Sequence, residues 1–305
     1  MIPSRVMPTQ ILLIAGPTAS GKSSRAVAEA QERGGEVISV DSRQVYRGLD
    51  IGTEKIFASE MQGVPHHLID IRSPLEPYSA GDFVQDATRL IADIHARGKL
   101  PILAGGTHFY FDALLNGLPM GTDMNPKLRK ELEKLTDEEL YARVRASDPR
   151  RADELDPKNR RRLVRALEII ASLGHVPTRP GKVRLSQGLG KSDFPKRYEV
   201  EWIVIDPPRE ELRTRIDVRL ENAFLRGLTD EVRRVREEVG DARLNELGLE
   251  YKIVGEYLRD ERTEESLLPI LSAKLWQYAR RQKAWLRKLH DEQTTAATPS
   301  LQDRN

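Results

Sequence analysis

Short apolar runs alternate along the chain with longer amphipathic segments. The first run, residues 11–15, is aliphatic and bounded by turn residues, which is typical of a strand buried on both faces. Similar runs predict four more strands, over residues 36–41, 66–71, 100–106 and 201–206. Between the strands lie segments with helical periodicity, one of them preceded by an S-x-x-D capping pattern at Ser79. This alternation predicts an α/β fold, with helices on both faces of a parallel sheet and ligands at the carboxyl ends of its strands.

Residues 123 to about 174 interrupt the alternation because they carry helix signals only. The predicted helix starts are Asn125 before Pro126, the capping box Thr136-x-x-Glu139, and Asp156 before Pro157. We therefore expect a small inserted helical domain, followed by a mobile loop rich in Gly, Pro, Ser and Lys. The predicted organisation is a first core part over 1–122, the insertion and loop over 123–198, a second core part over 199–290, and a disordered polar tail over 291–305.

Composition limits the classes of protein that fit this pattern. The chain has 305 residues, of which 31% are charged, yet its formal net charge is only +2, so any affinity for nucleic acid must come from local clusters. The absence of cysteine excludes disulfides, thiolate metal sites and a cysteine nucleophile. No apolar stretch approaches the roughly 20 residues that span a bilayer, and the start of the chain lacks a signal-peptide pattern. We expect a cytoplasmic protein without a membrane segment.

The first apolar run leads directly into a turn that fits the pattern G-x-x-x-x-G-K-[ST]. Its glycines let successive N–H groups point into one concavity, and the following helix adds its positive N-terminal end. Lys22 supplies a charge, and Ser23 is placed to offer its hydroxyl to a Mg²⁺ ion that bridges phosphate oxygens. An ordinary Gly-rich turn is the alternative. The strand before and the helix after favour a diphosphate-binding loop, which consists of Gly16, Pro17, Thr18, Ala19, Ser20, Gly21, Lys22 and Ser23.

A second group of polar residues, VDSRQVY over 40–46, follows the second predicted strand. In the ordinary alternative, an Asp or Ser in this stretch caps the next helix. Facing a phosphate loop, Asp41 is a candidate for Mg²⁺ coordination or for accepting a proton from a nucleophile, and the sequence does not choose between them. The turn Gly105-Gly106-Thr107 falls at the same predicted edge of the sheet.

Two helical segments carry clusters of basic residues. The segment 156–170 contains Lys158, Arg160, Arg161, Arg162 and Arg165. In the segment 273–290, the predicted buried stripe is Leu275, Tyr278, Gln282, Trp285 and Leu289. An amide within an apolar stripe must be hydrogen-bonded, so Gln282 is expected to bind either a structural partner or a ligand. Solvated helix faces are the default interpretation of such clusters, and phosphate contacts to a nucleic acid are the functional one.

Two rival functions use the same loop. A small-molecule kinase fits a phosphate loop with an aspartate at the second strand end, but it does not need two basic clusters. An RNA-binding nucleotide switch is the other rival. Against the switch, the chain has no N-K-x-D stretch, and neither Asp41 nor Asp70 is followed by the glutamate of a typical ATPase.

Seven motifs, taken together, closely resemble the family of bacterial tRNA dimethylallyltransferases, or tRNA isopentenylpyrophosphate transferases. In chain order, they are GPTASGKS, ISVDSRQVYRGLDIGT, PHHLIDI, PILAGGTHFY, NRRRLVRALEI, RIDVRLENAFLRGLTDEV and ARRQKAWLR. The likeness runs from about residue 11 to 287. One departure is that the family's usual IGTAKP reads IGTEKI over residues 51–56. Others are GLEYK in place of IGYKE, and Leu275 and Trp276 in place of a threonine and an arginine.

The resemblance implies an enzyme that transfers the dimethylallyl group from dimethylallyl diphosphate to the exocyclic N6 amine of the adenosine 3′ of the tRNA anticodon. The implied fold is a P-loop NTPase-like core with an inserted helical domain. In such an enzyme the loop holds the diphosphate leaving group, and no phosphoryl group is transferred. The implied substrates are tRNA and the prenyl donor, the implied cofactor is Mg²⁺, and we expect a monomer.

Residue roles follow from the same resemblance. It implies that Asp41 accepts the amine proton and that Thr107 binds the target base. Lys22 and Arg219 would neutralise the diphosphate, and Ser23 would hold Mg²⁺. These roles suit the chemistry, since stabilising the departing anion and removing a proton from a weakly basic amine both lower the barrier. The implied tRNA contacts are Asp41, Ser42, Arg43, Gln44, Thr107, Arg129, Arg161, Arg162, Leu163, Val164, Arg165 and Gln282.

Overall fold

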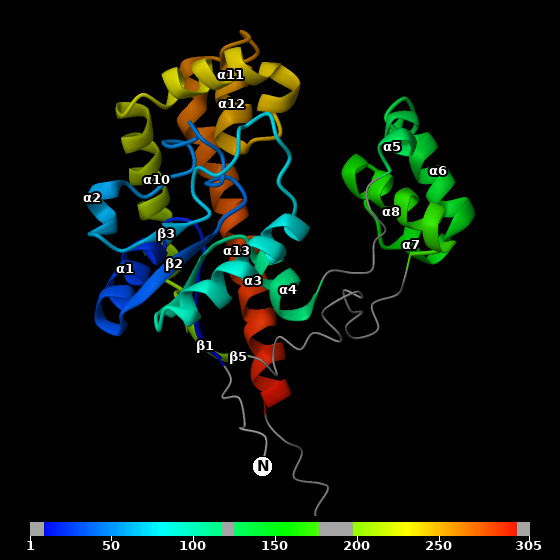
Figure 1. Cartoon of the computed structure of the whole chain (residues 1–305). Helices are drawn as coiled ribbons and strands as arrows, with labels where there is room; N and C mark the ends of the chain where they lie inside the picture. Colours follow the sequence, from blue (N-terminus) through cyan, green and yellow to red (C-terminus); the bar gives the residue numbers. More distant parts are fainter. Residues whose placement is uncertain (1–8, 118–124, 177–197, 298–305) are drawn as a thin grey trace, which may run out of the picture. The chain divides into compact units, whose positions relative to one another are not determined.

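Five parallel strands form one sheet in the order β3-β2-β4-β1-β5, as the predicted α/β fold requires (Figure 1). The computed structural model describes residues 9–117, 125–176 and 198–297. The strands are β1 (Thr9–Ala15), β2 (Gly35–Val40), β3 (His66–His67), β4 (Leu100–Gly105) and β5 (Tyr198–Val204). The carboxyl ends of β1, β4 and β2 are neighbours in this order, so the loops that follow these three strands share one edge of the sheet.

Helices precede and follow the strands along the described chain. They are α1 (Lys22–Arg33), α2 (Ala58–Met61), α3 (Ala80–Ala96), α4 (His108–Asn116), α5 (Pro126–Leu132), α6 (Asp137–Ser147), α7 (Pro149–Asp153), α8 (Arg160–Leu173), α10 (Arg209–Leu225), α11 (Leu228–Leu244), α12 (Leu249–Tyr257) and α13 (Leu267–Ala297), with a 3₁₀ turn over Glu264–Ser266. Ser79 caps α3 and Thr136 caps α6 through the capping boxes that the sequence predicts.

The two faces of the sheet bury different helices because successive strand residues point to opposite sides. Leu12 and Ile14 of β1 pack in one apolar cluster with Val27 of α1. Ile11 and Leu13 belong to the larger cluster on the other face. That cluster takes in residues of α3, α4 and α10 to α13, so the long helix α13, orange to red in Figure 1, is part of the main core.

Several predicted boundaries were wrong. The run 66–71 forms a strand of two residues only, because Leu68 and Asp70 adopt left-handed φ values of 62° and 56° that end the extended chain. Helix α8 begins at Arg160 with Asn159 as its N-cap, since Pro157 and Lys158 form a turn instead of a first helical turn. The last helix continues to Ala297, past the residue 290 where the sequence placed its end.

The chain divides into two compact units. The first contains residues 1–115 and 194–305, and the second contains residues 116–193, where the sequence predicts an insertion over 123–198. The second unit has a core of its own, which includes Leu132, Leu140, Val144 and Leu163. Most of the loop predicted over 174–194, and the tail beyond residue 297, lie outside the described residues.

Candidate active site

The phosphate loop connects β1 to α1 and has the backbone shape of an anion-binding site. Ala19 and Gly21 take left-handed φ values of 59° and 87°, which turn the chain sharply before the helix starts at Lys22. Gly21 is the N-cap of α1, and its positive φ explains why glycine stands at this position. The hydroxyl of Ser20 is buried without a hydrogen-bond partner among the described residues. The loop therefore presents a helix N-terminus and an unsatisfied hydroxyl, both suited to a phosphate ligand.

Lys22 lies at the start of α1 and bends back over the phosphate loop. Its ammonium donates a hydrogen bond to the carbonyl of Pro17 at 2.6 Å. Burial lowers the pKa of Lys22 to about 8, against the smaller opposing effects of Glu54 and Asp41, while Arg219 adds to the decrease. An anionic ligand would stabilise the protonated form of Lys22, because the ligand compensates for the lost hydration of the ammonium.

Gln282 of α13 is hydrogen-bonded to two turns of the site. Its Oε1 accepts the N–H of Thr18 at 2.8 Å, and its Nε2 donates to the carbonyl of Gly106 at 2.9 Å. The side chain is almost fully buried, so these bonds satisfy both ends of the amide that the sequence singled out. The requirement for a partner is thus confirmed, and both partners are structural. Tyr278, predicted to lie in the same buried stripe, is 40% exposed, because the buried stripe continues through Ala279.

Asp41 and Thr107 meet at the adjacent strand ends. The hydroxyl of Thr107 accepts the N–H of Ser42 at 3.1 Å, and the Thr107 N–H donates to the carbonyl of Val40. One carboxylate oxygen of Asp41, Oδ1, accepts the N–H groups of Arg43 at 2.7 Å and of Gln44 at 3.2 Å. The Oδ2 oxygen has no hydrogen-bond partner in the described chain. Asp41 is therefore held in place while one of its oxygens stays available.

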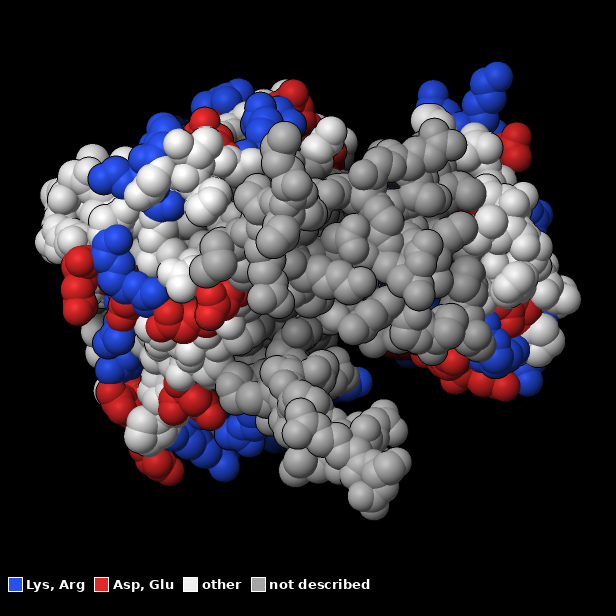
Figure 2. Space-filling model, turned by 60° about the horizontal axis from the view of Figure 1, so that its bottom comes forward, with Lys and Arg blue, Asp and Glu red and all other residues white. Residues whose placement is uncertain are grey.

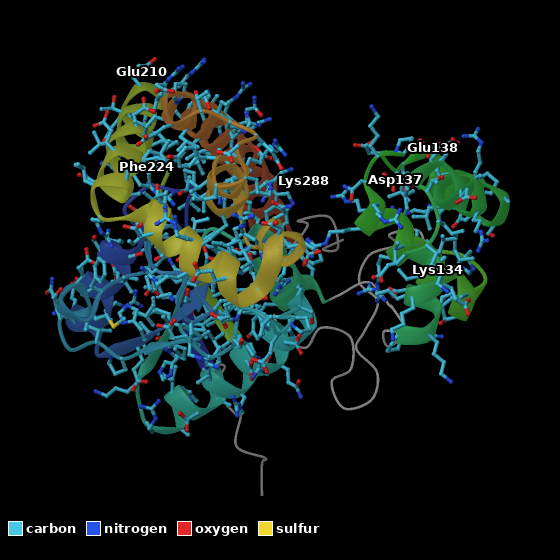
Figure 3. All side chains as sticks on the ribbon, turned by 90° about the horizontal axis from the view of Figure 1, so that it is seen from above. Lys134, Asp137, Glu138, Glu210, Phe224 and Lys288 are labelled. Carbon is cyan, nitrogen blue, oxygen red and sulfur yellow. The ribbon has the colours of Figure 1, made fainter. Side chains whose placement is uncertain are left out.

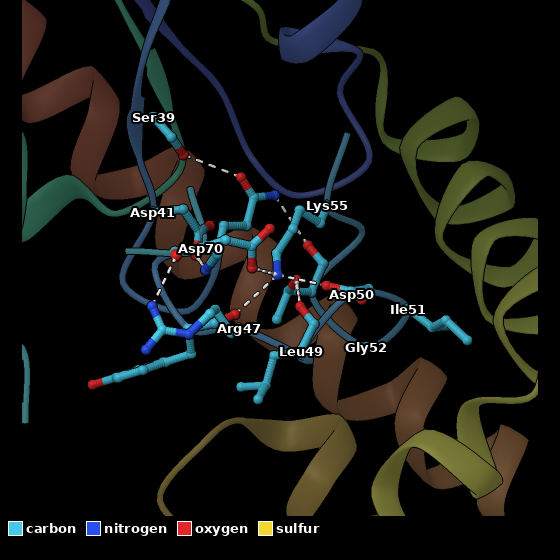
Figure 4. Close-up of polar contacts among 12 residues, drawn as sticks. Ser39, Asp41, Arg47, Leu49, Asp50, Ile51, Gly52, Lys55 and Asp70 are labelled. Carbon is cyan, nitrogen blue, oxygen red and sulfur yellow. Dashed lines mark hydrogen bonds and ion pairs between the residues drawn. The ribbon is translucent and has the colours of Figure 1, made fainter. Parts of the chain in front are cut away.

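Side-chain hydrogen bonds and ion pairs hold together the loop over residues 41–55 (Figure 4). The ammonium of Lys55 donates to Asp50 and Asp70, both at 2.5 Å, and to the carbonyl of Tyr46 at 2.9 Å. The amide of Gln44 accepts from Ser39 and donates to the carbonyls of residues 53 and 54. The side-chain amide of Gln44, an implied tRNA contact, is thus engaged inside the loop.

Glu231 of α11 fixes the same loop from the other side. Its carboxylate accepts three consecutive backbone N–H groups, those of Asp50, Ile51 and Gly52, at 2.7 to 3.0 Å. The hydroxyl of Tyr251 donates to it as well, at 2.7 Å. Glu231 is almost fully buried, and these four donors compensate for the lost hydration of its charge. Gly52 is required here, since a Cβ atom would lie 2.9 Å from the Tyr251 ring.

Arg219 of α10 extends from this braced loop to the phosphate loop. Its guanidinium donates to the hydroxyl of Thr18 and to the carbonyl of Gly52, the latter at 3.2 Å. It also forms ion pairs with Glu250 at 3.0 Å and with Glu54 at 3.2 Å. Burial raises the pKa of Glu250, and Arg219 opposes that change. A second arginine, Arg215, donates to the carbonyl of Ser20 at 3.2 Å.

The sequence assigned no role to four of these residues. Glu54, Arg215, Glu231 and Glu250 all lie in or against the site, although only Arg215 and Glu231 fall within one of the seven motifs, RIDVRLENAFLRGLTDEV. Glu54 and Glu250 fall in stretches where the chain departs from the family's usual motifs, and that departure was the available signal. His108 was missed too. Its ring stacks on Trp285 with 5.2 Å between centroids, and burial lowers its pKa to about 4. Both ring nitrogens are buried and have no hydrogen-bond partner among the residues that the structure describes.

The arginines of the second unit differ in exposure. Arg161 and Arg162 are exposed at the start of α8. Arg165 and Arg129 both bind Glu168, whose side chain is fully buried, at 3.1 and 2.9 Å. These two implied contacts therefore also stabilise the second unit. The implied contacts Leu163 and Val164 are buried in its core, so their side chains face away from any surface.

Other charges of the second unit serve its fold. Arg160 pairs with Asp137 at 2.9 Å and donates to two carbonyls near the end of α5. Asp137 and Glu138 lie in the first turn of α6, where negative charge is favourable (Figure 3). On the face shown in Figure 2, basic and acidic side chains are interspersed over the described parts of both units.

The part of the chain that the structure describes lacks two features. Among the described residues, no helix is long and apolar enough to cross a membrane. In the same part of the chain, no three His, Cys, Asp or Glu side chains cluster in a way that could hold a metal ion.

Comparison with known proteins places the chain in a family. Residues 44–289 match the family model described as IPP transferase. A tRNA dimethylallyltransferase from Anaeromyxobacter dehalogenans (strain 2CP-C) is 42% identical over 283 residues, which cover 92% of each protein. The crystal structure of a full-length tRNA isopentenylpyrophosphate transferase from Bacillus halodurans has a TM-score of 0.65 and 36% identity, covering 91% of this chain and 86% of that one.

A eukaryotic dimethylallyltransferase, described as acting on tRNA, is also similar in structure. Its TM-score is 0.73 at 28% identity, and the match covers 91% of this chain and 70% of that one. The resemblance that rested on separate motifs is thus confirmed over most of the sequence and over the fold. The chain belongs to the IPP transferase family.

Proposed function

We propose that this protein transfers the dimethylallyl group from dimethylallyl diphosphate to the N6 amine of the adenosine 3′ of the anticodon in tRNA. In this reaction the bond between the allylic carbon and the diphosphate oxygen breaks, a bond from N6 to that carbon forms, and N6 loses a proton. Diphosphate is the second product. The names of the relatives support this reaction and not the kinase alternative.

One observation carries the proposal. A continuous set of hydrogen bonds runs from Thr18 of the phosphate loop through Gln282 to the turn at Gly106, and from Thr107 to the turn that holds Asp41. A site for an anionic leaving group and a carboxylate are therefore joined on one edge of the sheet. Transfer of an allylic group to an amine needs both functions at one place.

The phosphate loop, Lys22 and Arg219 would bind the diphosphate. Backbone N–H groups and the start of α1 stabilise negative charge. The two cations neutralise the diphosphate oxygens as the bond to the allylic carbon breaks. The unpartnered hydroxyl of Ser20 offers a further donor inside the loop. These groups stabilise charge that grows during the reaction, so they lower the barrier more than they strengthen ground-state binding.

Mg²⁺ fits the residues present. The hydroxyl of Ser23 is exposed at the first turn of α1 and makes no hydrogen bond within the described chain. Mg²⁺ accepts few protein ligands when phosphate oxygens and waters complete its octahedron, so a cluster of carboxylates is not needed. When bound, the ion supplies positive charge to the diphosphate.

Asp41 would accept the proton from N6, and Thr107 would position the base. The fixed Oδ1 orients the carboxylate, and Oδ2 is available to the amine. The exposed Arg161 and Arg162 would contribute phosphate contacts to tRNA.

The test is single-turnover prenylation of tRNA by the Asp41→Asn variant. Asparagine keeps the size of the side chain and one acceptor oxygen but is not basic, so the transfer rate should fall by about 10² to 10⁴-fold. Donor affinity should barely change. A variant whose rate recovers when Mg²⁺ is raised, and whose donor affinity is weakened, would show instead that Asp41 organises the metal. Phosphorylation of a small molecule by the unaltered protein would favour the kinase.

A further inference from the structure

The guanidinium of Arg219 contacts four groups of the protein itself. Its Nη1 donates to the hydroxyl of Thr18, and its Nη2 donates to the Gly52 carbonyl and to Glu250. Its Nε pairs with the carboxylate of Glu54 at 3.2 Å. A phosphate oxygen that binds Nε of Arg219 must therefore replace Glu54.

The four partners differ in how easily they can leave. Thr18 belongs to the phosphate loop itself, and the Gly52 carbonyl is held by the N–H bonds to Glu231. The side chain of Glu250 is 11% exposed, as is that of Arg219. The side chain of Glu54, in contrast, is 50% exposed and can regain water when it moves away. Glu54 is therefore the partner whose release costs least.

We propose that Glu54 is an internal competitor for the diphosphate at Arg219, which sets how tightly this enzyme holds its donor and its product. In the free enzyme the Glu54 carboxylate forms an ion pair with Nε of Arg219. A phosphate oxygen displaces it when the donor binds, and the carboxylate returns as diphosphate leaves. The proposal rests on the proposed function only in taking diphosphate as a ligand of Arg219.

The charges around the phosphate loop support this competition. Lys22, Arg215 and Arg219 are cations that contact the loop, while Asp41, Glu54 and Glu250 are acidic groups that affect Lys22, Arg219 or one another. Among the acidic groups, Glu54 has the largest effect on Lys22, whose pKa it raises. Glu54 therefore forms an ion pair with one of the cations assigned to the diphosphate and raises the pKa of the other, and its negative charge repels the same ligand.

The backbone next to Glu54 is fixed independently of its carboxylate, because Glu231 accepts the N–H groups of residues 50–52. Residue 54 has a φ of 52°, in the left-handed region, and neither alanine nor glutamine relieves that strain, so both neutral variants keep the same backbone constraint.

Calorimetric titration of the full chain with inorganic diphosphate and Mg²⁺ tests the proposal. Glu54→Ala and Glu54→Gln should both bind diphosphate roughly threefold to tenfold more tightly, because each removes the competing ion pair and the repulsion. Glu54→Asp keeps the charge and should remain closer to the unaltered protein than either. Glu32→Ala removes the same charge from an exposed position near the end of α1 and should leave the affinity unchanged.

The outcomes separate this inference from the proposed function. A gain in affinity cannot come from misfolding, so tighter binding in both neutral variants supports competition directly. Unchanged or weaker binding in Glu54→Ala overturns the inference, whether or not the protein prenylates tRNA. An equal gain in Glu32→Ala overturns it as well, since net charge alone would then explain the effect. If tRNA is never prenylated while both neutral variants bind diphosphate more tightly, the proposed function fails and the competition stands.

Discussion

Lys22 shows how its surroundings change the chemistry of a single side chain. The motif supplies the lysine, but the pKa of about 8 comes from burial against the phosphate loop and the neighbouring Arg219. Asp41 is a comparable case. The sequence places it at a strand end, and the two N–H bonds to Oδ1 decide which of its oxygens remains available.

We expect diphosphate affinity to fall as the pH rises through about 8 in the free enzyme. Below that pH Lys22 is protonated and binds the anion, and above it the neutral amine contributes no charge. Lys22→Arg should abolish this fall, because an arginine stays protonated throughout the range. Titration calorimetry between pH 7 and about 9.5 compares the two proteins. Parallel curves for both would contradict the assignment.

At the scale of elements, the loop after β2 is shaped by a helix far away in sequence. Glu231 of α11 binds three consecutive N–H groups of residues 50–52, and Arg219 of α10 binds the carbonyl of Gly52. The loop thus connects the buried carboxylate of Glu231 to the guanidinium that faces the phosphate loop. Glu231 acts on the reaction only through this loop, as a positioning residue.

Glu231→Gln should lower the free energy of unfolding by about 2 to 4 kcal/mol and weaken diphosphate binding. The new NH₂ group would face backbone N–H groups that need an acceptor, and this mismatch is buried. Tyr251→Phe removes only one of the four hydrogen bonds and should cost about 1 kcal/mol. Urea unfolding and diphosphate titration measure both effects. Equal losses in the two variants would show that the three N–H bonds contribute little.

The arginines of helix α8 differ in their surroundings: one binds a buried carboxylate, and two are exposed. Arg165 binds the buried Glu168, so its replacement would disturb the second unit as well as any ligand. Arg161 and Arg162 lie exposed in the first turn of α8 and allow a cleaner test.

Arg161→Gln with Arg162→Gln should weaken tRNA binding without loss of stability. The slope of log affinity against log salt should become shallower by about 0.7 to 0.9 for each phosphate contact removed. Arg89→Gln, on an arginine that is 75% exposed on α3, is the matched control. Filter binding over a range of salt concentrations gives the slopes. A slope that stays the same would make these two arginines part of an ordinary solvated helix face.

For the whole molecule, the division into two units has a thermodynamic consequence. The phosphate loop, Asp41, Arg219 and Gln282 all belong to the first unit, and the second unit has its own core. Multi-domain chains do not generally unfold in a single two-state transition. A ligand of the phosphate loop therefore stabilises one unit directly.

Diphosphate with Mg²⁺ should raise the unfolding temperature of the first unit. At a free concentration of about 100 times Kd, the expected stabilisation is about 2.7 kcal/mol. Differential scanning calorimetry with and without diphosphate measures the shift. Lys22→Ala should lose it, because the variant lacks a cation of the binding site. A shift of the same size in that variant would place the binding elsewhere.

The sequence by itself determined the fold class and the family, and it supplied the candidate site residues. These features depend on local patterns, since apolar periodicity defines strands and helices, and the phosphate loop is one uninterrupted motif. The sequence also predicted that the amide of Gln282 is hydrogen-bonded. The short length of β3 could not be predicted, because the pattern of apolar residues does not show that Leu68 and Asp70 adopt left-handed φ values.

Only the tertiary structure decided how separate motifs act on one another. Gln282 bonds to Thr18 and Gly106, which are 264 and 176 residues away along the chain, and Glu231 holds a loop 179 to 181 residues away. Glu54, one of the partners of Arg219, is likewise distant from it in sequence. Hydrogen bonds and ion pairs depend on separations of a few ångströms in space, and no periodicity in the sequence records which distant residues the packing of helices on a sheet brings that close.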